Sequence, residues 1–243
     1  MSTLSAKGLR KSFGGVVAVD GADLDLHEGR INGLIGPNGS GKTTLFNIVT
    51  GMIKADSGTV RLGGTEVTGW SPHRIAHAGL GRTFQLCRVF PRLTVMENML
   101  VSLRRPRLRD ILGGLTSKAD VEVAMGWLER VGLDHLAGTD ARDLSYGQQK
   151  LLELAAVLMA DPQLILLDEP AGGVNPALID RIGDLVRDLN AEGRTFLIVE
   201  HNMAMVMSLC QHIIVFDRGR PIAAGPPAEI QSDPRVLEAY LGV

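Results

Sequence analysis

The chain has 243 residues, of which 45% are hydrophobic and 21% are charged, values typical of a globular protein. Its 25 Lys and Arg residues nearly balance its 27 Asp and Glu residues, and the formal net charge of −2 argues against nucleic-acid binding through bulk positive charge. No stretch approaches the ~18 unbroken apolar residues of a membrane span, and the two cysteines form no ligand cluster, so we expect a chain that works in a reducing compartment without crossing a bilayer by itself.

Short apolar runs alternate with helical patterns, which predicts an α/β fold with a largely parallel sheet. Strands covered on both faces carry apolar residues at every position, so the nearly continuous apolar runs should be the buried strands. The first ~25 residues and the segment 58–67 instead alternate apolar with polar residues, which predicts an antiparallel β arm beside the main sheet and makes the sheet mixed. The predicted buried strands are 31–35, 164–167, 195–199 and 213–216.

The β patterns disappear between about residues 90 and 159, where apolar residues recur at helical spacing over 95–103, 121–131 and 147–159. We therefore predict a single domain whose core, residues 1–88 and 160–243, is interrupted by an all-helical insertion at about residues 89–159. A basic run at 104–109 lies in this insertion. It is interpreted as a solvated loop, with proximity to anionic headgroups or an acidic partner as the alternative.

Residues 36–43 form a phosphate-loop pattern, G-x-x-x-x-G-K-[ST], between a predicted strand and a helical run that begins at Thr44. The glycines let successive backbone N–H groups converge on phosphate oxygens, and the helix N-terminus adds its partial positive charge. We expect Lys42 to reach the β- and γ-phosphates and Thr43 to place its hydroxyl on Mg²⁺. The alternative is a glycine-rich turn that only joins strand to helix. The predicted nucleotide ligands are Gly36, Pro37, Asn38, Gly39, Ser40, Gly41, Lys42, Thr43 and Thr44.

A pair of carboxylates, Asp168 and Glu169, ends the strand predicted at 164–167. Ligands of an open α/β sheet sit at the carboxyl ends of its strands. Asp168 is therefore expected to hold Mg²⁺, directly or through water, and Glu169 to polarise the water that attacks the γ-phosphate. Alone, this pair is better explained as a cap on the next helix; together with a phosphate loop, it indicates hydrolysis.

Residues 144–149, Leu-Ser-Tyr-Gly-Gln-Gln, open a predicted helix with a serine at the capping position. This segment resembles the LSGGQ signature of ATP-binding cassette (ABC) proteins, with Tyr146 where the first glycine usually stands. The other family motifs occur in order: Gln85 resembles the Q-loop glutamine, Asp168 and Glu169 match the second nucleotide motif, and His201 resembles the switch histidine. The resemblance covers nearly the whole chain and implies a P-loop ABC ATPase fold.

In this family two cassettes bind head to tail, so that ATP lies between the phosphate loop of one subunit and the signature helix of the other. The resemblance implies that Ser145, Gly147 and Gln148 contact the γ-phosphate across this interface. Phe13 resembles the aromatic residue that stacks on adenine, although a core position on the β arm is the alternative.

The resemblance also assigns the hydrolytic residues. It implies that Glu169 and His201 fix the attacking water, with Lys42 and Gln85 as the other catalytic residues. Gln85 is further implied as a Mg²⁺ ligand, beside Thr43 and Asp168, and as the relay to the helical insertion that the family presents to its membrane partners. The implied cofactors are ATP and Mg²⁺.

Three features resemble cassettes that serve branched-chain amino acids and related amides. Asn175-Pro176 stands in the D-loop, where Asp is commonest; Gly81-Arg82-Thr83-Phe84-Gln85 forms the Q-loop segment; and the chain closes with Glu229-Ile230 and Ala239-Tyr240-Leu241-Gly242. The implied function is that of the ATP-hydrolysing subunit of an importer for branched-chain amino acids, related amides or hydrophobic amino acids.

The implied partners are a second ATPase subunit, identical or different, two integral membrane permeases and a separate substrate-binding protein, with no nucleic acid. The implied location is the cytoplasmic face of the bacterial inner membrane, as a peripheral protein. The alternatives are an ABC ATPase for another cargo, such as urea or exported lipopolysaccharide, and a soluble cassette that acts on DNA or ribosomes. A regulatory cassette without hydrolysis is disfavoured because Lys42, Glu169 and His201 are all present.

Overall fold

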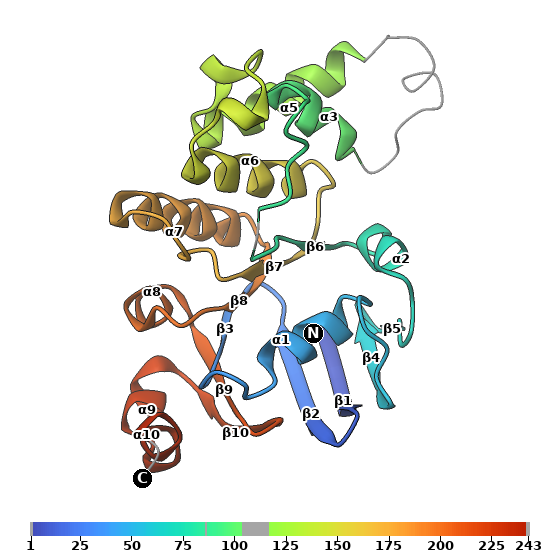
Figure 1. Ribbon diagram of the computed structural model, residues 1–243, viewed down its shortest axis with the longest axis vertical. Coiled ribbons are helices and arrows are strands. Elements are labelled where there is room, and N and C mark those ends of the chain that lie inside the picture. The colour runs from blue at the N-terminus through green and yellow to red at the C-terminus, as the bar shows by residue number, and fades with distance from the viewer. Residues whose placement is uncertain (1, 86, 104–116, 242–243) are drawn as a thin grey trace.

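The computed structural model describes residues 2–85, 87–103 and 117–241, which form two sheets surrounded by helices (Figure 1). The basic run at 104–109 lies outside the described residues. The strands are β1 (Ser2–Phe13), β2 (Val16–His27), β3 (Ile31–Ile35), β4 (Ser57–Leu62), β5 (Thr65–Glu66), β6 (Leu80–Arg82), β7 (Leu164–Asp168), β8 (Thr195–Val199), β9 (His212–Asp217) and β10 (Arg220–Gly225). The α-helices are α1 (Lys42–Val49), α2 (Pro72–His77), α3 (Val95–Val101), α5 (Lys118–Val131), α6 (Tyr146–Leu158), α7 (Pro176–Ala191), α8 (Met203–Leu209), α9 (Pro227–Ser232) and α10 (Pro234–Leu241), with short 3₁₀ helices η1 (Asp134–Leu136) and η2 (Ala141–Asp143).

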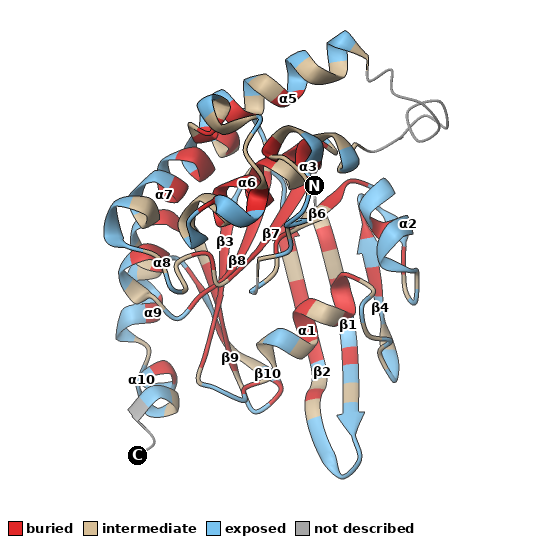
Figure 2. Cartoon of the chain, turned by 45° about the horizontal axis from the view of Figure 1, so that its top comes forward, coloured by how far each residue is buried: buried red, intermediate tan, exposed pale blue. Residues whose placement is uncertain are grey.

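The main sheet has six strands in the order β10-β9-β3-β8-β7-β6, and all but β10 run parallel to their neighbours. Every residue of β3, β7 and β8 is buried, as the continuous apolar runs predicted (Figure 2). The register places Leu34, Val199 and Asp168 in one row across β3, β8 and β7. The segments that follow these three strands therefore leave the sheet at the same edge.

The main sheet is mixed because of β10, an edge strand antiparallel to β9. The two strands are joined at Arg218 and Gly219, whose φ angles of 46° and 80° suit a two-residue hairpin turn. Pro221 lies within β10, which an edge strand tolerates because one of its sides has no hydrogen-bonding neighbour. The sequence analysis did not predict β10, since its Pro, Ala and Gly residues are untypical of a strand.

The predicted antiparallel arm is a separate four-stranded sheet in the order β2-β1-β4-β5. It packs against the main sheet through side chains on its apolar face rather than by strand pairing. Leu4, Leu9 and Leu24 of the arm share one buried cluster with Leu45 and Phe46 of α1. The arm therefore fixes α1, and with it the loop that precedes α1, against the main sheet.

Two clusters of buried apolar side chains cover the opposite faces of the main sheet. Because successive residues of a strand point to opposite faces, Leu164 and Leu166 join the cluster around α1, whereas Ile165 and Leu167 join the cluster that contains the helices from α3 to α8. The second cluster is continuous with the interior of the helical region, so this region packs against the sheet rather than standing apart from it.

Helices α3, α5 and α6 gather at one end of the molecule (Figure 1). They correspond to the helices predicted at 95–103, 121–131 and 147–159, and the described residues between β6 and β7 contain no strand. Capping boxes open α3 and α6, formed by Thr94 with Glu97 and by Ser145 with Gln148. The predicted α/β class is confirmed, and the division at 89–159 stays a prediction. Within the described part of the chain no helix is long and apolar enough to span a membrane.

Candidate active site

The phosphate loop joins β3 to α1, and close packing requires glycine at two of its positions. A Cβ atom at Gly36 would lie 2.0 Å from the carbonyl oxygen of Phe216 in β9. At Gly41, where φ is 103°, a Cβ atom would lie 2.2 Å from the carbonyl oxygen of Ala18 in β2. No side chain fits at such distances, so both sheets hold the loop in one conformation. Asn38, Gly39 and Thr43 are exposed, Pro37 and Thr44 are partly exposed, and Ser40 is buried.

Lys42 begins α1, and its ammonium group folds back into the loop. Its Nζ donates hydrogen bonds to the carbonyl oxygens of Gly36 at 2.7 Å and Pro37 at 2.9 Å. Burial lowers the pKa of Lys42, and the nearby charge of Glu169 acts in the opposite direction. Among the described residues no carboxylate forms an ion pair with this ammonium. A partly buried cation with only neutral partners suits an anionic ligand such as a nucleotide phosphate.

Asp168 ends β7, and its buried carboxylate pairs with Arg82 of β6. The guanidinium Nη2 lies 3.0 Å from Oδ2 of Asp168, and both side chains are buried. Burial raises the pKa of Asp168, and Arg82 acts to lower it. Arg82 also donates to Oδ1 of Asn47 in α1 at 2.7 Å and to Oγ1 of Thr50, the C-cap of α1, at 2.9 Å. One guanidinium thus connects the helix after the phosphate loop to the carboxylate predicted to hold Mg²⁺.

The residues present fit a magnesium ion held jointly with phosphate. Thr43 offers an exposed hydroxyl beside Lys42, and Asp168 offers a carboxylate at the same sheet edge. No group of three or more His, Cys, Asp or Glu residues suited to a metal occurs in the described parts of the chain. Magnesium commonly binds through one or two protein groups and completes its shell with phosphate and water, so this sparse set is what such a site needs.

Glu169, Gln85 and His201 come together beside Asp168, although they belong to three different segments. Gln85 Nε2 donates to Glu169 Oε2 at 2.8 Å, and His201 Nδ1 lies 4.0 Å from Glu169 Oε1. Glu169 has a φ of 47°, a conformation that is uncommon for a residue with a side chain and often marks a functional position. Three of the four predicted catalytic residues therefore form one cluster, and the fourth, Lys42, is near enough for its charge to interact with that of Glu169.

The signature residues lie apart from this cluster. Ser145 Oγ accepts a hydrogen bond from the Gln148 amide at 3.3 Å, and Gln148 Oε1 accepts one from the Ser145 amide at 2.9 Å. Within the described chain no hydrogen bond joins Ser145, Gly147 or Gln148 to the phosphate loop. Ser145 and Tyr146 are exposed, and Gly147 packs against Leu178, where a Cβ atom would lie 2.5 Å from Cδ2. One chain thus presents only the start of the signature helix outward, while the rest of α6 is largely buried.

Phe13 lies at the end of β1 with 48% of its surface exposed, so the alternative of a core position is wrong. Lys11 Nζ lies 5.5 Å from the centre of its ring. The exposed ring of Phe13 therefore remains available for stacking.

Asn175 caps α7 by accepting a hydrogen bond from the Leu178 amide at 2.9 Å. The Asn175 side chain therefore already has a partner within the chain.

The sequence analysis missed several buried charged residues that support the cluster. Glu200 is almost fully buried and accepts hydrogen bonds from the amides of Ala171 at 2.7 Å, His201 at 2.9 Å and Asn202 at 3.0 Å. Lys150 and Glu153 of α6 are also buried. The signal that points to Glu200 is its position directly after a fully apolar strand, next to His201. For Lys150 and Glu153 it is a pair of charges within an otherwise apolar helix.

Comparison with known proteins agrees with this geometry. A family profile described as ABC transporter matches residues 19–172, and one described as branched-chain amino acid ATP-binding cassette transporter matches residues 220–243. The high-affinity branched-chain amino acid transport ATP-binding protein BraF of Pseudomonas aeruginosa is 42% identical over 98% of this chain and 97% of its own length.

Solved structures share the fold. The ADP conformation of MJ1267, an ATP-binding cassette of an ABC transporter, has a TM-score of 0.89 and 37% identity, with complete coverage of both chains. The dimeric structure of MJ0796, a bacterial ABC transporter cassette, has a TM-score of 0.82 and 25% identity over 92% of this chain and 98% of its own. The predicted P-loop ABC ATPase fold is therefore confirmed.

Replacing Arg82 with Met should destabilise the fold, because Asp168 would keep its buried charge without a partner. We expect the free energy of unfolding in urea to fall by about 3–5 kcal/mol. The control is Arg187→Met, which removes an ion pair with Asp184 on the exposed face of α7 and should cost less than about 1 kcal/mol. Equal effects of the two substitutions would show that the Arg82–Asp168 pair contributes no more to stability than an exposed ion pair.

Proposed function

The chain belongs to the ATP-binding cassette (ABC) transporter family, and we propose that it is the ATP-hydrolysing subunit of an importer for branched-chain amino acids or related amides. As a member of this family it is an ATPase, which converts ATP and water into ADP and phosphate. One observation carries the proposal: the phosphate loop with the Lys42 ammonium, which has no ion pair among the described residues, lies at the same sheet edge as the buried Asp168 and the cluster around Glu169. The name of the relative from Pseudomonas aeruginosa supports the cargo class.

In the proposed mechanism the loop N–H groups and Lys42 bind the phosphates of ATP. The Lys42 ammonium then donates its hydrogen bonds to phosphate oxygens instead of the carbonyl oxygens of Gly36 and Pro37. Thr43 and Asp168 would hold Mg²⁺, which neutralises charge on the β- and γ-phosphates when bound. These groups position the γ-phosphate and are independent of the groups that activate water.

Glu169 is the proposed general base for the attacking water. Gln85 orients this carboxylate by donating a hydrogen bond to Oε2, and His201 Nδ1 lies 4.0 Å from Oε1. His201 is exposed and is able to donate to a phosphate oxygen of the bound nucleotide. Glu200 fixes the main chain of His201 by accepting a hydrogen bond from its backbone amide.

The proposed site is completed by a second ATPase subunit. The signature helix presents Ser145 and its first-turn N–H groups outward, and a helix N-terminus binds anions. A head-to-tail partner places this end of α6 on the γ-phosphate held by the opposite phosphate loop. The dimer of MJ0796 supports such an assembly, and the partner here is either a second copy or a different ATPase chain.

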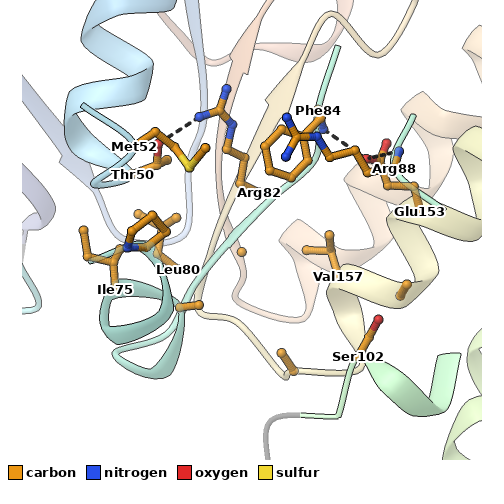
Figure 3. A pocket seen from close by; sticks show the side chains of 15 residues that line it. Thr50, Met52, Ile75, Leu80, Arg82, Phe84, Arg88, Ser102, Glu153 and Val157 are labelled. Carbon is orange, nitrogen blue, oxygen red and sulfur yellow. Dashed lines mark hydrogen bonds between the residues drawn. The ribbon is translucent and has the colours of Figure 1, made fainter. Parts of the chain in front are cut away.

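The proposed docking site for the two membrane permeases is a groove of about 350 Å³ between α2, β6 and α6 (Figure 3). Met52, Ile75, Leu80 and Val157 give it apolar walls, and Arg88 adds a charge. An amphipathic cytoplasmic segment of a permease suits this lining. In this proposal the chain is a peripheral subunit on the cytoplasmic face of the membrane. A separate substrate-binding protein brings the cargo to the permeases.

The substitution Glu169→Gln tests the hydrolytic assignment. It keeps the size and hydrogen-bonding reach of the side chain but removes the base, so hydrolysis should fall by at least about 100-fold while ATP affinity changes little. Loss of the carboxylate also relieves repulsion with the γ-phosphate, so the ATP-bound dimer should live longer in size-exclusion chromatography. Lys42→Ala is the contrast and should lose phosphate affinity and dimerisation together. Near-normal phosphate release by Glu169→Gln would show that Glu169 is not the general base.

Cross-linking to the co-expressed permeases tests the docking site. In a Cys87→Ser background, Ser102→Cys places a reactive thiol at the groove, whereas Lys7→Cys places one on the exposed face of the β arm. We expect permease adducts from the thiol at position 102 and none from the thiol at position 7. Adducts from position 7 alone would show that the permeases dock elsewhere.

A further inference from the structure

Helix α6 carries two buried charged side chains within its apolar length. Lys150 is 7% exposed and Glu153 is 6% exposed, and their spacing of three residues places them on the same side of the helix. Charged groups this deeply buried are rare unless they are paired or hydrogen-bonded. What each of them contacts therefore indicates its purpose.

Glu153 holds the backbone on both sides of Gln85. Its Oε1 atom accepts hydrogen bonds from the amide of Phe84 at 3.2 Å and from the amide of Arg88 at 3.1 Å (Figure 3). The Arg88 guanidinium also stacks on the Phe84 ring, 4.0 Å from its centre. A single carboxylate oxygen on α6 thus holds the main chain at Phe84, before Gln85, and at Arg88, after it.

Lys150 holds the segment that follows Glu169. Its Nζ donates to the carbonyl oxygen of Glu169 at 3.0 Å and to that of Pro170 at 3.4 Å. Glu169 and Gln85 are hydrogen-bonded to each other through their side chains. The main chain at or beside both members of this pair is therefore fixed to one helix, which is capped by the signature residue Ser145.

We propose that Glu153 is the positioning residue for Gln85: its Oε1 atom ties the main chain around Gln85 to the signature helix, so that α6 and the hydrolytic cluster of the same subunit move as one unit. Lys150 completes this connection at Glu169. The proposal rests on the proposed hydrolytic role of Glu169 and Gln85 for its effect on catalysis, but the tie itself is a property of the chain alone.

The tie does not require a charge on Glu153. Burial raises the pKa of Glu153 to about 7, so both protonation states occur at neutral pH. Because both amides bond to Oε1, a proton on Oε2 leaves the acceptor in place. An amide oxygen at the same position has the same capacity, since a carbonyl oxygen offers two lone pairs. A substitution that keeps this oxygen but removes the charge therefore tells whether Glu153 acts as a hydrogen-bond acceptor or as a charge.

The test compares Glu153→Gln, which retains the acceptor oxygen, with Glu153→Leu, which fills similar space without one. Amide hydrogen exchange of Phe84 and Arg88 is measured by NMR on the full chain without nucleotide. ATP hydrolysis is measured separately at a protein concentration that supports dimerisation. Glu153→Leu should speed exchange of both amides by at least about tenfold and lower kcat by about tenfold, with KM for ATP changed less than about threefold. Glu153→Gln should match the wild type in both measurements.

Unchanged exchange in Glu153→Leu would overturn the proposal, and so would equal damage by Glu153→Gln, which would show that charge or packing matters instead. If Glu153→Leu does not fold, Glu153→Ala supports the same comparison with Glu153→Gln. The exchange measurement needs no ATP. A wild-type chain that hydrolyses no ATP even with its partner ATPase and permeases would count against the proposed function, and the exchange result would still decide on Glu153.

Discussion

The register of the parallel strands is the constraint on which the site depends. Leu34, Val199 and Asp168 lie in one row, and the Glu169 amide donates to the Val199 carbonyl oxygen at 2.9 Å. The phosphate loop, Asp168 with Glu169, and Glu200 with His201 therefore leave the sheet side by side, although they are far apart in the sequence. A shift of one residue in the pairing of β7 with β8 would separate Glu169 from His201 and turn the side chains of β7 to the other face.

Burial of charge then fixes each of these segments. Arg82 pairs with Asp168, Glu200 holds the amides around His201, and Lys150 and Glu153 hold the main chain near Glu169 and Gln85. Each of these charged groups has its partners inside the chain, so contacts within the chain hold the segments of the cluster together. Lys42 and the start of α6 differ in exposure, because Lys42 is only partly buried and Ser145 is exposed. These are the two places at which the proposed mechanism brings in phosphate.

Local sequence patterns were sufficient for the fold class, the buried strands and the phosphate loop, because each depends on neighbouring residues. The assignments of Gln85, Ser145 and His201 needed family resemblance, since the residues near them in the sequence do not indicate which groups their side chains will contact. Arg82 and Glu153 could not be assigned a role in this way: their partners, Asp168 and the Phe84 amide, become neighbours only when the sheet and α6 are assembled. The β10 strand was missed because an edge position tolerates Pro221, which a propensity argument counts against a strand.

The central claim is that one chain holds an incomplete site, whose signature half must come from a second ATPase subunit. The most direct measurement is ATP turnover per molecule of the isolated chain as a function of protein concentration, with Mg²⁺ and saturating ATP. A weak interface between the subunits predicts that turnover per molecule rises with concentration, because more of the sites are then complete. A high turnover that stays constant down to nanomolar concentrations would contradict the shared site.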